Sequence, residues 1–303
     1  FQAEDGIRDF CLSRGLGDVY KRQVLDHNKR VLPYVEDFRD RRARGQIHPV
    51  NDFLFTYYSH RPGQLLRWSP GIGFGLEVKG YDYRIGSHFK LKNKICSLDF
   101  NLMRDRQKKE LVWIHNLMKL TSTRSGIFKC FGLHEWAMVY RASLSDIRHE
   151  KYPLRMTLDQ VNNFLNSQKL CCSHYDAFRF FTPEARSMNN VELGIDDRMK
   201  YEQPACLHTN MDLYKWSYKL SPWMASEVIV DAFLLALEIR QLDMRASPYD
   251  LRSLGYEPIK VETASGREEY ESLQRDFSSK AKPIRQRILN STEEIIRSLE
   301  IKI

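Results

Sequence analysis

Histidines and carboxylates stand inside apolar segments of this sequence, where ionisable side chains are rare. His208 and Asp212 are four residues apart and therefore share one face of a helix. Burying an unpaired charge costs several kcal/mol, so such side chains must meet one another or a ligand. The candidates of this kind are His134, Glu135, His174, Asp176, His208, Asp212 and Glu238.

These groups suit two kinds of chemistry. The candidates for general acid and base catalysis are Asp212, Asp176, Glu135, His208 and His174. Helical proteins also hold metals with inward-facing Glu and His, and a set of this kind suits Fe, Mn or Zn. The candidate metal ligands are His134, His174, His208 and Glu238, although their spacing reproduces no common metal signature. The structural alternative is that His174 and His208 are core histidines bonded to Asp176 and Asp212.

Two helices must position most of these residues. The first is predicted over residues 206–219, and the second, after a break at Ser221-Pro222, over residues 225–244. The second helix is apolar nearly all round, which is typical of a helix buried on most sides. We expect its one polar stripe to face a site or an ion-pair network; the stripe holds Glu227, Asp231 and Glu238.

The rest of the chain predicts a mainly α, single-domain helical fold. Glycines interrupt residues 68–100 and separate short runs such as residues 81–85, which predicts an irregular segment or a short hairpin within this stretch. Thr157 and Gln160 form a capping-box pattern that opens a helix. Residues 170–181 fit either a strand or a buried helix. Further helices are predicted over residues 26–45, 49–61, 102–122, 128–141, 157–168 and 266–299, the last broken near Pro283.

Residues 1–23 are predicted to be an adapter-derived artefact, and residues 24–303 the native helical domain with a charged C-terminal helix. The run from Asp18 to Gln23 back-translates to GATGTGTATAAGAGACAG, the end sequence of a transposase used to build sequencing libraries. The run from Gln2 to Asp9 back-translates to a flow-cell adapter. Such a segment is set aside from the fold. Its charges cancel, so the net charge of +8 belongs to the remainder.

Composition restricts the class of protein. A net charge of +8 is compatible with a polyanionic partner such as DNA. No apolar run approaches the length of a membrane span, so no membrane partner is expected. Five cysteines remain outside the adapter segment, two of them adjacent and none in a C-x-x-C pair, which indicates neither a disulfide framework nor a zinc knuckle. A cytoplasmic protein is expected; composition leaves the oligomeric state open.

Several runs of sequence resemble a bacterial family of about 300 residues whose members are usually described as 3-methyladenine DNA glycosylases. The resemblance covers nearly all of residues 40–290. Pro70 to Gly73 is similar to the glycine hairpin of helix-hairpin-helix glycosylases, but the following FGLEVKGYDYR predicts no helix. The runs that carry the resemblance are HPVNDFLFTYYSHRPGQLLRW, CFGLHEWAMVYR, CSHYDAFRFFTPEAR, EQPACLHTNMDLYKWSYKLSP and EIRQLDMRASPYDLRSLGY.

The resemblance implies a DNA repair enzyme that flips an alkylated purine such as 3-methyladenine out of damaged DNA and cleaves its N-glycosidic bond without a cofactor. A cationic base favours aromatic faces, and the phosphates favour basic side chains. A carboxylate near the oxocarbenium-like sugar would be Asp212, Asp176 or Glu135. The substrate-binding candidates are Trp136, Tyr140, Tyr214, Trp216, Lys215 and Arg141.

A third interpretation makes the chain a non-enzymatic DNA-binding protein. Its buried carboxylates would then serve ion pairs only. The neighbouring groups for such pairs are Arg240, Asp243 and Arg245.

Overall fold

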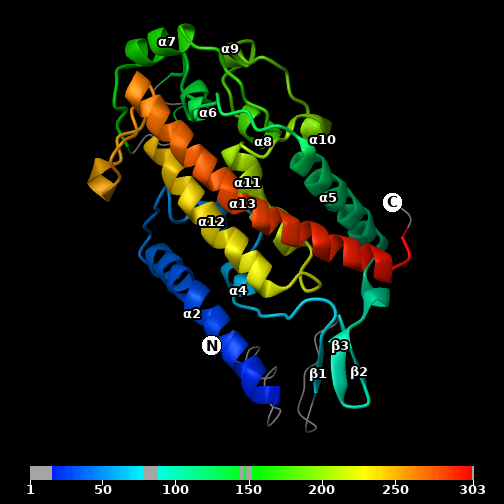
Figure 1. Ribbon diagram of the computed structural model, residues 1–303. Helices are drawn as coiled ribbons and strands as arrows, with labels where there is room; N and C mark the ends of the chain where they lie inside the picture. The colour runs from blue at the N-terminus through cyan, green and yellow to red at the C-terminus, as the bar shows by residue number, and fades with distance from the viewer. Residues whose placement is uncertain (1–15, 78–87, 144–146, 148–151, 302–303) are drawn as a thin grey trace. The chain divides into compact units, whose positions relative to one another are not determined.

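A computed structural model describes residues 16–77, 88–143, 147 and 152–301, and it confirms the mainly helical fold class (Figure 1). The chain forms two compact units. Unit 1 comprises the residues up to Met118 together with Leu213–Leu234 and the chain from Ile284 onwards. Unit 2 comprises Lys119–Asp212 and Leu235–Pro283.

Unit 1 begins with α2 (Leu16–Ala43), so the last residues of the predicted adapter segment are helical, while residues 1–15 lie outside the described part. Short helices α3 (Phe53–Tyr57) and α4 (Pro62–Leu65) follow. Pro62 opens α4 at its first position, where a missing N–H costs nothing. Unit 1 also contains η1 (Phe100–Leu102) and most of α5 (Asp105–Thr123).

The glycine-rich segment holds a three-stranded antiparallel sheet in the order β1 (Gly75–Glu77), β3 (Ile95–Leu98), β2 (Phe89–Lys92) (Figure 1). A two-residue turn joins β2 to β3. Its residues Asn93 and Lys94 have φ of 50° and 65°, as a type I′ hairpin turn requires. The expected short hairpin therefore exists within residues 68–100, at residues 89–98, while residues 81–85 lie outside the described part.

The core of unit 1 is apolar and aromatic. On α5, one face is fully buried and consists of Leu111, Ile114, Leu117 and Met118. The segment after Pro49 also contributes aromatic side chains to the core, among them the buried Phe55 and Tyr58. Several of its rings meet those of α2 and of the helices after residue 213; the contacts are Phe38–Phe55, Phe55–Phe233, Tyr58–Tyr214 and Tyr34–Phe233.

Gly71 is required by a close approach of backbone segments within unit 1. Its φ is +81°, and a Cβ there would lie 2.7 Å from the backbone nitrogen of Ala225. We expect Gly71→Ala to lower the free energy of unfolding by about 1–3 kcal/mol more than Gly45→Ala. Gly45 has φ of +67° but open space around it, so its variant measures the cost of the left-handed conformation alone. Urea titrations of both variants check this, and equal losses would refute the role of the close approach.

His60 gives unit 1 a pH-dependent stability. Its Nδ1 lies 2.9 Å from the Tyr214 hydroxyl, and its ring stacks on Tyr218 at 4.6 Å. Burial, helped by the charge of Arg67, lowers the pKa of His60 from 6.5 to about 4. The unfolded chain therefore takes up a proton below about pH 6.5 that the folded chain refuses, so stability falls as the pH drops towards 4.

We expect this histidine to remove about 2 kcal/mol of stability between pH 7 and pH 5, because each unit of pKa difference corresponds to about 1.4 kcal/mol. His60→Gln should flatten that part of the decline. Urea unfolding of wild type and variant at both pH values measures it. An unchanged decline in the variant would show that other groups cause it.

Unit 2 is built from short helices and irregular segments, together with parts of four long helices. Thr157 and Gln160 form the predicted capping box at α7. The elements are α6 (Leu133–Ala137), α7 (Leu158–Asn166), α8 (Tyr175–Phe178), α9 (Pro183–Arg186), η3 (Ile195–Asp197), α10 (Arg198–Tyr201), η4 (Arg252–Leu254) and residues of α5, α11 (Leu207–Lys219), α12 (Ser226–Arg245) and α13 (Ala264–Ser298).

Three predictions about these elements need correction. The helix expected over residues 128–141 is confined to α6, because Gly132 adopts a left-handed conformation at its start. Residues 170–181 form neither a strand nor a long helix but the four-residue α8. The helix α13 continues through Pro283, since Ala281 and Ile284 on either side are buried and their burial offsets the lost hydrogen bond.

Candidate metal centre

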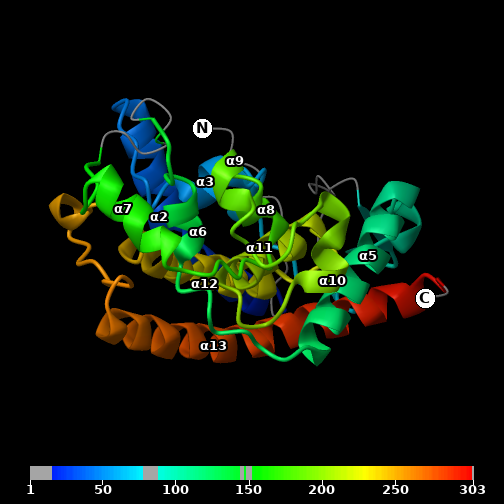
Figure 2. The same ribbon diagram turned by 90° about the horizontal axis from the view of Figure 1, so that it is seen from above.

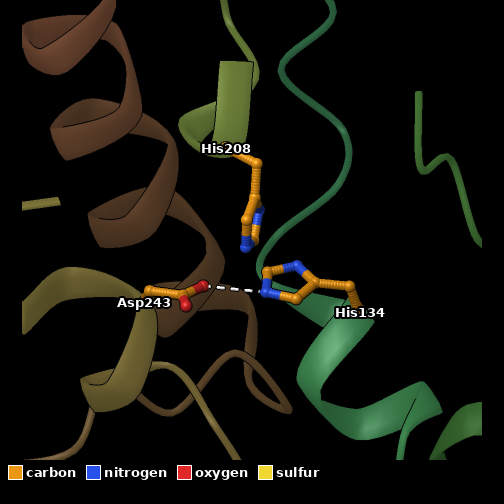
Figure 3. Close-up of side chains that lie close together, drawn as sticks. All are labelled: His134, His208 and Asp243. Carbon is orange, nitrogen blue, oxygen red and sulfur yellow. Dashed lines mark ion pairs between the residues drawn. The ribbon is translucent and has the colours of Figure 1, made fainter. Parts of the chain in front are cut away.

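Three separate segments of unit 2 bring His134, His208 and Asp243 together (Figure 3). His134 comes from α6, His208 from the first turn of α11 and Asp243 from the last turns of α12. The His134 Nε2 lies 2.8 Å from Asp243 Oδ1, and the two imidazole rings are 4.4 Å apart and nearly perpendicular. All three side chains point towards one another, and one donor atom from each lies within 4.8 Å of the others.

Arg240 and Glu135 stand behind this set. Arg240 Nη1 donates to Asp243 Oδ2 at 2.7 Å and to Glu135 Oε1 at 3.0 Å. Both carboxylates and the guanidinium are almost completely buried. Because Arg240 engages Oδ2, the other carboxylate oxygen of Asp243 is left to face the imidazole of His134.

A second set lies beside the first. His174 Nε2 is 3.2 Å from Asp212 Oδ2 and 3.7 Å from Glu202 Oε1, and all three residues are buried. Arg198 contacts Glu202 at 3.7 Å and Asp176 at 2.8 Å.

The two sets adjoin through their histidines. The rings of His174 and His208 stack with centroids 5.5 Å apart. Helices α6, α8 and the first turns of α11 accordingly lie close together in both views (Figures 1 and 2).

Protonation distinguishes the two histidines of the first set. Burial, with the nearby His134, lowers the pKa of His208 to about 3, so this imidazole is neutral at physiological pH. For His134, burial acts downward, but the charge of Asp243 outweighs it and raises the pKa. Burial would raise the pKa of Asp243, yet His134 and Arg240 hold it well below its usual range. His208 is therefore neutral beside an ionised Asp243, while the raised pKa of His134 favours its protonated form, which a bound cation would have to replace.

Local packing explains how unit 2 holds these side chains in place. Gly132 has φ of +69°, and a Cβ there would meet the ring of Tyr270 at 3.2 Å, so a glycine lets α6 begin next to that ring. Two side-chain hydrogen bonds hold the segment at the start of α11. Gln274 donates to Ala205 O at 2.7 Å, and Asn210 donates to Pro204 O at 3.0 Å. His208 is thereby placed in the first turn.

A pocket in unit 2 reaches His134 from the surface. Its cavity volume is about 20 Å³, room for roughly one water molecule. Its walls carry thiols rather than charged groups, and burial raises the pKa of Cys172 and raises that of Cys206 to about 12, so both stay protonated. The lining residues are Cys130, Leu133, His134, Leu170, Cys171, Cys172, Ser173, Phe181, Gln203 and Cys206.

The structure groups most of the candidate catalytic and metal-binding residues but excludes one. Glu238 is about half exposed and pairs with Lys280 at 3.2 Å. It is therefore wrong as a ligand beside the histidines, and the α12 carboxylate found there is Asp243. Asp231, on the same predicted stripe, pairs with Arg30 and Arg287. The stripe therefore forms ion pairs, one of its two expected roles, and Glu238 is exposed to solvent.

The structural alternative paired His174 and His208 with Asp176 and Asp212, but the structure shows other pairs. His174 contacts Asp212, four residues after His208, whereas Asp176 contacts Arg198 and Arg179. Glu135 is held by Arg240. The five candidate catalytic residues thus belong to one buried polar cluster of unit 2, though in different pairs.

The predicted substrate-binding side chains do not form one binding surface. Trp136 and Tyr140 are buried in unit 2, where Trp136 donates to Ala246 O at 2.8 Å and the Tyr140 hydroxyl lies 2.6 Å from Asn166 Oδ1. Arg141 is exposed and lies over the Tyr140 ring. The remaining three belong to unit 1: Tyr214 bonded to His60, Trp216 packed on Trp113, and Lys215 over the Trp216 ring.

Asp243 and Glu202 belong to the two sets of possible metal ligands but were not among the candidate site residues predicted from the sequence. The sequence indicates Asp243 only as an ion-pair neighbour of Arg240, and the structure confirms that contact. The signal for its burial is its place between Leu242 and Met244 in the apolar helix. Glu202 lies just after α10, outside the helices predicted from the sequence, and its sequence surroundings carry no comparable signal.

Comparisons with protein-family models, with curated proteins and with solved structures find no match to this chain. Among the residues that the structure describes, each helix is too short or too polar to cross a lipid bilayer.

Proposed function

We propose that this chain is a metal-dependent enzyme whose centre is the set His134, His208 and Asp243. The observation that carries the proposal is the convergence of two imidazoles and a carboxylate, from three separate segments, on one point inside unit 2. One donor atom of each lies within 4.8 Å of the others, and His134 Nε2 contacts Asp243 Oδ1 at 2.8 Å. Burying these ionisable groups costs free energy, and a shared cation would offset that cost.

The chemistry of the donors fits a first-row divalent ion. Two imidazoles and a carboxylate suit Fe, Mn or Zn and leave further coordination positions for a substrate. Arg240 and Glu135 would orient Asp243, as groups behind metal ligands commonly do. A bound ion would supply Lewis-acid polarisation of a substrate oxygen or lower the pKa of a water. The small pocket lined by protonated thiols would admit a water molecule towards His134.

Elemental analysis of the purified full chain tests the proposal. We expect at least one equivalent of Fe, Mn or Zn per chain, retained after dialysis. His208→Ala should lose the ion bound at this set and so retain at least one equivalent less than wild type, while Glu238→Gln, which changes an exposed carboxylate, should retain as much as wild type. Metal-free wild-type protein that also fails to take up added Mn²⁺ or Zn²⁺ would refute the proposal.

The DNA glycosylase activity implied by the resemblance is the second candidate. It is favoured by the net charge of +8 and by Asp212, a buried carboxylate held at 3.2 Å from His174 that could stabilise a cationic sugar. The five described cysteines are thiols, which agrees with a cytoplasmic site of action. Release of 3-methyladenine from alkylated DNA, abolished in Asp212→Asn, would support it. Binding of DNA without release would instead favour the non-enzymatic alternative.

A further inference from the structure

We infer that His174, Glu202 and Asp212 form a second metal site, so that unit 2 holds a two-metal centre. The inference rests on the proposed function and extends it by one ion. Its three residues come from separate segments: His174 precedes α8, Glu202 follows α10, and Asp212 lies on α11. Donor atoms from all three lie within 4.8 Å of one another.

Burial makes this set more than a surface group of charges. The side chains of His174, Glu202 and Asp212 are at most 2% exposed. His174 Nε2 faces both carboxylates, at 3.2 Å from Asp212 Oδ2 and 3.7 Å from Glu202 Oε1. Burying an imidazole and two carboxylates this deeply costs desolvation free energy, and coordination of a cation would offset part of it.

The second set repeats the arrangement of the first. In each, an arginine joins a carboxylate of the set to a carboxylate outside it. Arg240 contacts Asp243 at 2.7 Å and Glu135 at 3.0 Å. Arg198 contacts Glu202 at 3.7 Å and Asp176 at 2.8 Å. Arg240 donates a hydrogen bond to Asp243, whereas Arg198 at 3.7 Å from Glu202 forms an ion pair beyond hydrogen-bond distance. Charged groups behind a metal-binding carboxylate commonly orient it, so the shared charge pattern favours the same role for both sets.

The sets are adjacent parts of one centre. His208 of the first and Asp212 of the second are one helical turn apart on α11, and the His208 ring stacks on His174 at 5.5 Å. The donors differ, since the first set has two imidazoles and the second has two carboxylates. The second set is therefore the harder site, and Mn²⁺, which accepts both donor types, should fill both.

The test counts Mn²⁺ bound to the metal-depleted full chain by calorimetry and elemental analysis. We expect two ions per wild-type chain, one in Asp212→Asn, one in His208→Ala, and two in the exposed control Glu238→Gln. Circular dichroism of each variant establishes that it is folded, and His174→Gln replaces Asp212→Asn if that variant unfolds.

One ion in wild type, lost in His208→Ala but kept in Asp212→Asn, would overturn the second site and leave the proposed function intact. No bound ion in wild type would overturn both. Because the wild-type count alone separates two ions from one, the result does not depend on the folding of any variant.

Discussion

Asp243→Asn is expected to lower the free energy of unfolding at pH 7 by about 3–5 kcal/mol, because it leaves a buried guanidinium without its nearest counter-charge. Asp243 is fully buried, and it contacts both Arg240 at 2.7 Å and His134 at 2.8 Å. Asparagine preserves the size of the side chain, so the loss measures charge rather than volume. Urea titration of metal-depleted protein gives the value.

Glu238→Gln is the matched control, since it removes a carboxylate from the same helix. Glu238 is about half exposed and its pair with Lys280 is on the surface, where such pairs contribute about 1 kcal/mol or less. If Asp243→Asn costs no more than this control, the buried cluster does not depend on the charge of Asp243.

Trp136→Ala is expected to cost about 3–5 kcal/mol of folding stability, as truncation of a buried aromatic side chain does. Trp136 is fully buried, its ring packs on Phe164 at 4.9 Å, and its indole N–H donates to Ala246 O. The loss identifies Trp136 as part of the core of unit 2 instead of a platform for a flipped base. Chemical denaturation monitored by circular dichroism measures it.

Arg141→Ala provides the comparison, because the resemblance assigned Arg141 to the same substrate surface. Arg141 is exposed, so its loss should change stability by about 0.5 kcal/mol or less. A stable Trp136→Ala protein with weakened binding of alkylated DNA would contradict the structural role and favour the glycosylase.

Helical periodicity fixed the elements around the site closely. The expected helices over residues 206–219 and 225–244 correspond to α11 (Leu207–Lys219) and α12 (Ser226–Arg245). The apolar spacing and the break at Ser221-Pro222 are local features of the sequence, so they can be recognised without knowing which segments pack against these helices. The pairing of His208 with Asp212 on one face followed from the same periodicity.

Periodicity did not determine which face of α12 turns inward. Asp231 and Glu238 share a stripe, but both pair with basic side chains, and Asp243 occupies the place expected of Glu238. In a helix that is apolar nearly all round, several orientations bury similar area, and only packing against other segments selects one. The sequence therefore predicted the kind of side chain at the site better than its identity.

Residues outside regular elements were the least predictable. Glu202 follows the four-residue α10, and His174 directly precedes the four-residue α8. Such positions depend on contacts such as Gln203 with Ile127 and Asn189 with Cys172, which join residues far apart in the chain. Neither alternation nor helical spacing carries that information.

Anomalous diffraction from a crystal soaked in Mn²⁺ tests the central claim most directly, because it locates the ion without reference to activity. We predict an anomalous peak within coordination distance of His134, His208 and Asp243, with a second peak beside His174, Glu202 and Asp212. Peaks confined to the molecular surface, with no anomalous density among His134, His208 and Asp243, would contradict it.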